Sequence, residues 1–202
     1  MPIIENKLGI TSQIELNKAE ERISKAAAKK LYDTGAINKI KAGIFAGLKQ
    51  IHKALFKDIY DFAGKMRDVN IAKGNFRFAP LMYLPQSLKT IDKMPQKTFD
   101  EIIEKYVEMN IAHPFREGNG RAERIWLDLI LKKELKKVID WNKVDKDEYL
   151  SAMQRSTVKD AEIKQLLKSA LTNKINDRKI FMKGIDTSYY YEGYAEFKTE
   201  EL

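Results

Sequence analysis

The sequence predicts an all-α domain that carries one β-hairpin. Apolar residues recur at three- and four-residue spacing over most of the 202-residue chain, which is typical of amphipathic helices. Residues 58–85 differ, because short β-type runs alternate there with glycine and proline. A Gly-Asn-Gly turn at 118–120 precedes a stretch that is apolar on most sides, and a helix of that kind belongs at the centre of a bundle.

The composition is typical of a soluble globular protein with one domain. Hydrophobic residues make up 44% and charged residues 33% of the chain, which is long enough for one substantial core. There is no apolar run of the roughly 20 residues that a membrane span needs, and the N-terminus does not resemble a signal peptide. The chain has no cysteine, which excludes disulfides and thiolate metal sites. We expect a bacterial, cytoplasmic protein with no membrane contact, and we leave export by a signal-less route open.

The net charge of +8 is compatible with nucleic acid or with an acidic partner. The lysines, however, are spread along the chain and interleaved with Glu and Asp, which indicates a solvated surface. The pattern therefore argues against nucleic acid as a substrate. Binding of ATP or of an acidic protein target explains the positive net charge equally well.

Two helices are expected before the hairpin, over residues 12–32 and from about Asn38 to Phe56. His52 lies on the second of them. Because His113 is the only other histidine, a multi-histidine metal site is excluded, and we interpret His52 as a structural or surface residue.

The hairpin is expected where VNI and FRF flank the turn signal Lys73-Gly74-Asn75, and these should be the only strands. An isolated hairpin is marginally stable, but its exposed edge can accept another extended chain. The segment is therefore either a simple cover over the core or a docking site.

The remaining helices are expected over residues 85–95, 98–112, 121–135, 145–157 and 160–172. The second of these should end at His113, because Pro114 biases the residue before it away from helix. A last short helix, capped by Asp186 or Thr187 and ended by Gly193, is expected near the C-terminus.

Residues 113–124, HPFREGNGRAER, bring together residues that can bind a ligand or take part in a reaction. The glycine turn should open a helix whose free N–H groups and partial positive charge suit an anion. Arg121 and Arg124 share a face in the first turn, where arginine is normally unfavourable, so we expect a strong anion such as a polyphosphate.

His113 and Glu117 complete this stretch. A histidine titrates near neutrality and can take a proton from a hydroxyl, whereas a carboxylate is a hard ligand for Mg²⁺ that is shared with substrate phosphates. Together they predict phosphoryl-type chemistry on a hydroxyl. The alternative is a helix-capping loop with a solvated histidine and surface arginines, which is the better interpretation of any one residue but not of the whole set.

HPFREGNGRAER resembles the signature of Fic-domain proteins at every defining position. The resemblance implies a Fic fold, in which a helical bundle surrounds the central helix that follows the signature loop. It also implies transfer of AMP from ATP to a hydroxyl side chain of a target protein. In this reading His113 is the general base, Glu117 holds the Mg²⁺ that bridges the α- and β-phosphates, and Phe115 anchors the loop. The related Doc kinases have lysine at Gly120, so the glycine argues for AMP transfer.

The resemblance also assigns the ATP-binding residues, with Arg124 at the γ-phosphate: Lys73, Asn110, Gly118, Asn119, Gly120, Arg121 and Arg124. A Gly-x-x-Arg element, matched by Gly64 and Arg67, implies that the hairpin is the flap along which the target protein binds.

A second resemblance lies near the C-terminus, where Ser188-x-x-x-Glu192-Gly193 is similar to the inhibitory motif of Fic proteins. It implies that Glu192 pairs with Arg124 at the γ-phosphate position, as in Fic proteins whose inhibitory helix is C-terminal (class III). The adjacent tyrosines are candidates for self-modification by AMP: Tyr189, Tyr190 and Tyr191.

We accordingly predict a Fic domain over residues 1–184, with a flap at about 67–84 and a signature loop at 113–124, and an inhibitory helix over 185–197. The predicted activity is protein adenylyltransfer with ATP and Mg²⁺. Use of another nucleotide donor, removal of AMP by the same site, and a non-catalytic basic binding protein remain as alternatives. Self-association is a natural way to hold a terminal helix in place.

Overall fold

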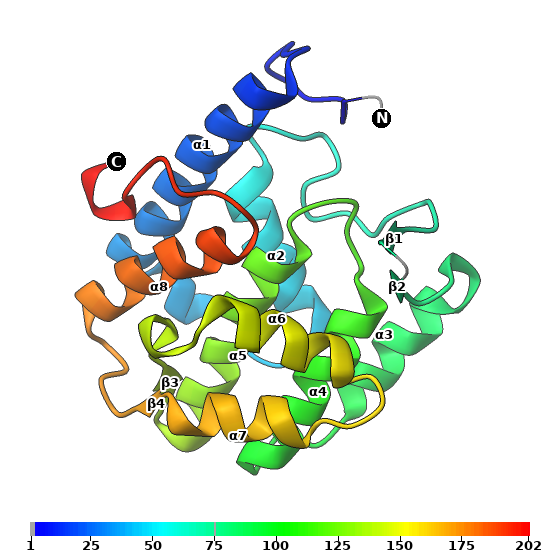
Figure 1. Cartoon of the computed structure of the whole chain (residues 1–202), viewed down its shortest axis with the longest axis vertical. Helices are drawn as coiled ribbons and strands as arrows, with labels where there is room; N and C mark the ends of the chain where they lie inside the picture. Colours follow the sequence, from blue (N-terminus) through cyan, green and yellow to red (C-terminus); the bar gives the residue numbers. More distant parts are fainter. Residues whose placement is uncertain (1–2, 75) are drawn as a thin grey trace.

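The computed structural model describes residues 3–74 and 76–202, and in this part of the chain the fold is predominantly helical, as predicted (Figure 1). The α-helices are α1 Gln13–Asp33, α2 Phe45–Phe56, α3 Leu84–Lys93, α4 Phe99–Ala112, α5 Asn119–Leu135, α6 Lys146–Arg155, α7 Ala161–Ser169 and α8 Arg178–Tyr191. The 3-10 helices are η1 Ala36–Lys39, η2 Leu81–Tyr83, η3 Trp141–Lys143 and η4 Thr199–Glu201. The strands are β1 Ala72–Lys73, β2 Phe76–Arg77, β3 Val138–Ile139 and β4 Leu171–Thr172. Asn75 of the predicted turn lies outside the described residues.

Helix α5 is the central element, as the sequence predicts. It packs against α4 on one side and against α2 and α8 on others, and Figure 1 shows it in the middle of the molecule. Its side chains are buried nearly all round, and Trp126, Leu127 and Leu131 are inaccessible to solvent. Because α5 follows the signature loop directly, the hydrophobic core fixes the position of the loop.

Helix α4 leads into the N-terminal end of the signature loop. It starts with a capping box, in which the Thr98 hydroxyl accepts from the Glu101 N–H at 3.3 Å and the Glu101 carboxylate accepts from the Thr98 N–H at 3.0 Å. It ends at His113, which adopts the left-handed conformation with φ 49°. Pro114 follows, so the helix stops where the sequence predicts.

Helices α1 and α8 lie side by side, and the C-terminal segment folds back along α1 (Figure 1). Two buried residues of α1 hold that segment. The Glu21 carboxylate accepts from the backbone N–H groups of Glu196 and Phe197, and Lys25 donates to the Phe197 carbonyl at 2.6 Å. The first helix and the last segment therefore form one side of the bundle.

The starts of two helices differ from the sequence prediction. Helix α2 begins at Phe45 and not near Asn38, because Ile44 is extended and Asp92 of α3 accepts from the Phe45 N–H at 2.6 Å. Helix α8 begins at Arg178, earlier than predicted, because Asp177 caps it by accepting from the Ile180 N–H. Asp186 and Thr187 therefore lie inside α8 and do not start a short helix.

The prediction that the flap contains the only strands is wrong. Strands β3 and β4 form a second antiparallel pair, in which Val138 is opposite Thr172 and Ile139 is opposite Leu171. Asp128 of α5 supports it by accepting from the Ile139 N–H at 2.8 Å. Strands of two residues are too short to show the alternation from which a strand is recognised. No helix within residues 3–74 and 76–202 has the length and apolar character needed to cross a bilayer.

Arg67 ties the flap to the end of α4. Its side chain is buried, and it donates to the carbonyls of Val69 and Ala79 on the two sides of the hairpin, at 2.7 and 2.5 Å. It also donates to the carbonyls of Ala112 at 3.2 Å and His113 at 2.8 Å. One guanidinium thus sets the distance between the flap and His113.

We expect Arg67→Lys to lower the free energy of unfolding by about 2 kcal/mol. The single ammonium group of lysine cannot reach all the carbonyls that the planar guanidinium binds, so some of these buried acceptors lose their donor. Urea denaturation measures the effect. Arg77→Lys, on exposed strand β2, is the matched control and should change stability by less than about 0.5 kcal/mol. Equal stability of the two variants would contradict the assigned role of Arg67.

Candidate active site

The signature loop is braced from within by Asn119. Its Oδ1 accepts from the Phe115 N–H and its Nδ2 donates to the Phe115 carbonyl, both at 2.8 Å. Phe115 itself is fully buried, which agrees with its predicted role as an anchor. Because the amide of Asn119 is used inside the loop, a phosphate contact at this position falls to the backbone N–H.

His52 supports the loop from below and is a structural residue, one of the two roles predicted for it. Its ring stacks on Phe115 with centroids 3.8 Å apart, and one nitrogen contacts the Glu117 carbonyl at 2.8 Å. The other nitrogen accepts from the Gly64 N–H at 2.9 Å, so Nε2 carries the proton. Burial lowers the pKa of His52 to about 4, which keeps this single protonation state.

The loop leads into the N-terminus of α5 with its backbone donors available. The first helical bond runs from the Ala122 N–H to the Gly118 carbonyl, so the N–H groups of residues 119–121 precede the bonded turns. Gly118 has φ 78°, and a Cβ there would lie 2.5 Å from the Phe56 ring, so both backbone conformation and space require glycine. The arrangement suits an anion.

His113 faces the flap. Its Nδ1 lies 3.3 Å from the carbonyl of Asn110, which favours the tautomer with the proton on Nδ1 and leaves Nε2 as the acceptor. Its ring stacks on Phe78 with centroids 3.6 Å apart. Burial lowers the pKa of His113 to about 4, against smaller raising effects of the Asn110 carbonyl and Glu192, so the ring is neutral and able to accept a proton at pH 7.

Glu117 carries a carboxylate that fits a Mg²⁺ ion. Its side chain is 41% exposed, its Oε1 accepts from Arg121 and from the Gly118 N–H, each at 3.0 Å, and its Oε2 accepts from none of the described residues. Mg²⁺ is commonly held by one or two carboxylates together with substrate phosphates, which this single exposed oxygen matches. In the described part of the chain, no cluster of three or more potential ligands forms an all-protein metal site.

Arg124 is the meeting point of the signature loop and α8. The predicted ion pair with Glu192 is present, with Nη2 2.8 Å from Oε1. Arg124 also donates to the Ser188 hydroxyl through Nε at 2.6 Å and to the Ser188 carbonyl through Nη2 at 3.0 Å. Ser188 and Glu192 therefore act on one guanidinium, as their four-residue spacing predicts.

Gly120 makes room for this pair. A Cβ at position 120 would lie 2.6 Å from the Glu192 Oε1 and 2.9 Å from the Arg124 Nη1. Lys73 of the flap reaches the other oxygen of Glu192 at 3.5 Å, although its side chain is 73% exposed. Burial alone would raise the pKa of Glu192, but the charges of Arg124 and Lys73 outweigh it and lower the pKa to about 2.

The other residues of the C-terminal motif are divided between core and surface. Gly193 has φ 91° and ends α8, as predicted. Tyr189 and Tyr191 are buried, whereas Tyr190 is 51% exposed. Of the three candidates for self-modification, only Tyr190 is accessible while α8 is docked.

Comparison with known proteins identifies the family. The Fic/DOC family profile matches residues 45–131. Protein adenylyltransferase VbhT of Bartonella schoenbuchensis is 34% identical over 163 residues, which are 74% of this chain and 33% of VbhT. The chain carries a Fic domain. The probable protein adenylyltransferase Fic of Escherichia coli is 26% identical over 188 residues, which cover 88% of this chain and 91% of that protein.

Solved structures of Fic domains share the fold. BepC of Bartonella tribocorum, crystallised with AMPPNP, superposes with a TM-score of 0.67 at 21% identity and covers 83% of this chain and 91% of its own. The Fic domain of Bep8 from Bartonella sp. 1-1C gives a TM-score of 0.70 at 18% identity, with coverage of 87% and 93%. The chain spans only a third of the length of VbhT.

Sequence reasoning missed three residues of this Fic domain. Glu20 of α1 pairs with Arg121, Tyr149 of α6 accepts from Arg124 at 3.4 Å, and Glu123 of α5 is fully buried beside Arg124. The two glutamates look like ordinary surface charges of a helix in the sequence. Only Tyr149 carries a signal, since it occupies an apolar position of its helix.

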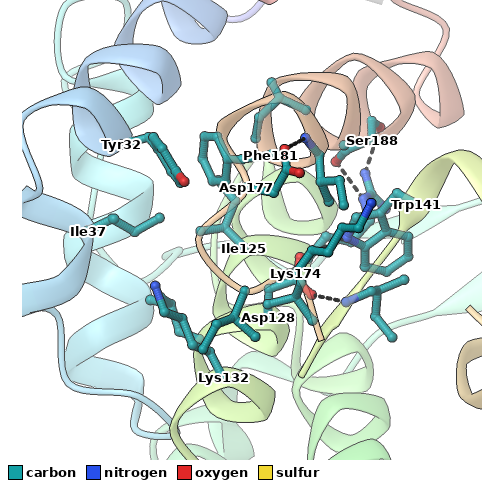
Figure 2. A pocket seen from close by; sticks show the side chains of 18 of the residues that line it. Tyr32, Ile37, Ile125, Asp128, Lys132, Trp141, Lys174, Asp177, Phe181 and Ser188 are labelled. Carbon is teal, nitrogen blue, oxygen red and sulfur yellow. Dashed lines mark hydrogen bonds between the residues drawn. The ribbon is translucent and has the colours of Figure 1, made fainter. Parts of the chain in front are cut away.

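An apolar cavity of about 60 Å³ lies behind Arg124, on the side of the Fic domain formed by α1, α5 and α8. Figure 2 shows Tyr32 and Ile37 on one side of it and Trp141 and Ser188 on the other. The cavity shares Arg124 and Ser188 with the site, but His113 and Glu117 do not line it.

Glu123 yields a prediction about stability. Neither carboxylate oxygen has a hydrogen-bond partner among the described residues, and burial raises its pKa to about 8. In the unfolded chain the group ionises near 4.5, so the folded state binds the proton more tightly and stability falls as pH rises from about 5 to 8. We expect Glu123→Gln to reduce the loss of melting temperature between pH 5.5 and 8.5 by at least about 3 °C.

Thermal unfolding by circular dichroism at both pH values checks this prediction. Glu148→Gln, on the exposed first turn of α6, serves as the control and should leave the pH dependence unchanged. Identical pH dependence in parent and Glu123→Gln would show that the carboxyl does not titrate as assigned.

Proposed function

We propose that this Fic domain is a protein adenylyltransferase, which transfers AMP from ATP to a hydroxyl side chain of a target protein. The observation that carries the proposal is the placement of a neutral His113, the exposed oxygen of Glu117 and the guanidinium of Arg124 around the free N–H groups of α5. The names of VbhT and of the Escherichia coli relative support the same reaction.

The residues have distinct roles in this proposal. The Nε2 of His113 takes the proton of the target hydroxyl, which then attacks the α-phosphate, and pyrophosphate leaves. We assign phosphate binding to the backbone of Gly118, Asn119 and Gly120 and to Arg121, although without ATP the Gly118 N–H and the Arg121 guanidinium both donate to Glu117. Glu117 would hold the Mg²⁺ ion, which neutralises phosphate charge when it is bound.

Residues around the signature loop bind the γ-phosphate, the rest of the nucleotide and the target protein. Arg124 binds the γ-phosphate, while Lys73 and Asn110 border the nucleotide from the flap and from α4. The edge of the β1–β2 hairpin holds the target backbone by strand addition, so that its hydroxyl meets His113.

We further propose that Glu192 restrains this activity. Its carboxylate binds the guanidinium that the γ-phosphate requires, and arginine binds carboxylate and phosphate in the same bidentate manner. ATP that enters with its γ-phosphate displaced presents a misaligned α-phosphate, and misalignment costs on the order of 100-fold in rate. In this proposal the Fic domain spans residues 1–184, and the inhibitory element spans residues 185–197, which include the last turns of α8 and its C-cap Glu192.

The test is AMP transfer from α-labelled ATP with Mg²⁺ into the proteins of a bacterial lysate. We expect Glu192→Gly to raise labelling on the order of 100-fold, and the double variant Glu192→Gly/His113→Ala to return it to background. Label from γ-labelled ATP would instead indicate phosphate transfer. Equal labelling by the parent and Glu192→Gly would exclude the inhibitory role of Glu192.

The pKa of His113 gives a pH prediction for the Glu192→Gly variant. A base with a pKa of about 4 remains neutral down to about pH 5, so the rate should fall less than about twofold from pH 7.5 to 5.5. An unperturbed histidine with a pKa of 6.5 would lose about tenfold over the same interval. Enzyme held at pH 5.5 and assayed at pH 7.5 controls for inactivation, and a tenfold fall with full recovery would contradict the prediction.

A further inference from the structure

We infer that Glu20 is a positioning residue that orients the carboxylate of Glu117 through the guanidinium of Arg121. The inference rests on the proposed function, because it concerns the cation that Glu117 would hold. It assigns a role in the site to α1, a helix that lies outside residues 45–131, the part that matches the family profile.

Glu20 is buried, and several hydrogen bonds hold its carboxylate in place. Its side chain is only 2% exposed, and its carboxylate accepts from three donors on three segments. Oε1 accepts from Arg121 Nη1 of α5 and from the Tyr194 hydroxyl at 2.9 Å, and Oε2 accepts from the Tyr60 hydroxyl. Burial would raise the pKa of Glu20, but Arg121 and the hydroxyls outweigh it and lower the pKa, so the group is ionised.

The guanidinium that Glu20 binds cannot reorient. Arg121 is 1% exposed, and the rings of Phe56, Tyr189 and Tyr194 lie 5.0, 5.3 and 4.8 Å from its central carbon. A planar group enclosed in this way presents its two terminal nitrogens in fixed directions.

The second terminal nitrogen of Arg121 points at the candidate metal ligand. Its Nη2 donates to Oε1 of Glu117 at 3.0 Å, and this leaves Oε2 for a cation. The result is a carboxylate–guanidinium–carboxylate row, in which the buried end is fixed and the far end is half exposed. Partners that fix a metal ligand in this way typically change metal affinity by about 10- to 100-fold when removed.

The negative charge of Glu20 determines whether its removal weakens or strengthens cation binding by Glu117. With Glu20 in place, one cation is shared between two carboxylates, so Glu117 retains negative charge for a divalent ion. Without the charge of Glu20, Glu117 is the one carboxylate partner of Arg121 among the described residues, which draws Oε1 toward the guanidinium and opposes an incoming cation. The same uncompensated guanidinium attracts the phosphates of ATP, so nucleotide binding without metal does not weaken.

The experiment measures ATP binding by calorimetry in the Glu192→Gly background, over a series of Mg²⁺ concentrations and in EDTA. We expect Glu20→Gln to raise the Mg²⁺ concentration for half-maximal enhancement of binding by about tenfold. The affinity for ATP in EDTA should be unchanged or higher. Mn²⁺ binding in the presence of ATP, followed by its paramagnetic signal, is a second readout that does not depend on transfer activity.

Two further variants separate positioning from folding. Glu21→Gln alters the adjacent, equally buried carboxylate of α1, which binds Lys25 and the C-terminal segment and not Arg121; it should leave both affinities unchanged. Glu20→Asp keeps the charge on a shorter side chain and should give an intermediate Mg²⁺ requirement. All variants are compared at a temperature at which thermal melting shows them folded.

Each result has one meaning. A higher Mg²⁺ requirement with intact metal-free ATP binding supports the inference. Equal loss of both affinities, or no change in either, overturns it, since Glu20 would then support the fold alone or nothing at the site. If the Glu192→Gly parent itself binds ATP without any effect of Mg²⁺, the proposed function fails independently of Glu20, and the inference fails with it.

Discussion

Two guanidinium groups lie buried one helical turn apart at the start of α5, and the surrounding structure supplies the anions that they require. Arg121 and Arg124 are each 3% exposed or less. A buried cation without a partner is strongly destabilising, so each must be met by a carboxylate in the absence of substrate. Glu20 and Glu117 meet the first, and Glu192 meets the second. For this reason α1 and the C-terminal end of α8 each place a carboxylate against the start of α5.

That constraint explains why α1 and α8 belong to the site although neither lies in the signature. Glu20 is contributed by the first helix, and Glu192 by the end of the last one. Buried contacts of Glu21 and Lys25 hold the segment beyond Glu192 against α1. The position of Glu192 is therefore set by packing far from the loop as well as by Arg124.

The sequence predicted the central helix, the helix before it and the flap, because each depends on local signals. Thr98 and Pro114 delimit α4, and the glycine turn opens α5. It also located the ion pair of Arg124 through a motif. It did not find Glu20, whose partner is 101 residues away, since long-range pairing leaves no periodic trace. The start of α8 was also missed, because Asp186 and Thr187 have the side chains of helix caps, whereas the residue that caps the helix is Asp177.

The two carboxylates differ in a way that matches their proposed roles. Glu20 is held by two tyrosine hydroxyls besides Arg121 and is almost inaccessible, so no incoming phosphate can displace it without opening the core. Glu192 is 22% exposed and its second partner is the exposed Lys73. A triphosphate approaching from the flap side meets Glu192 at an accessible edge. This difference in burial supports the proposed exchange of anions at Arg124 and a permanent carboxylate at Arg121.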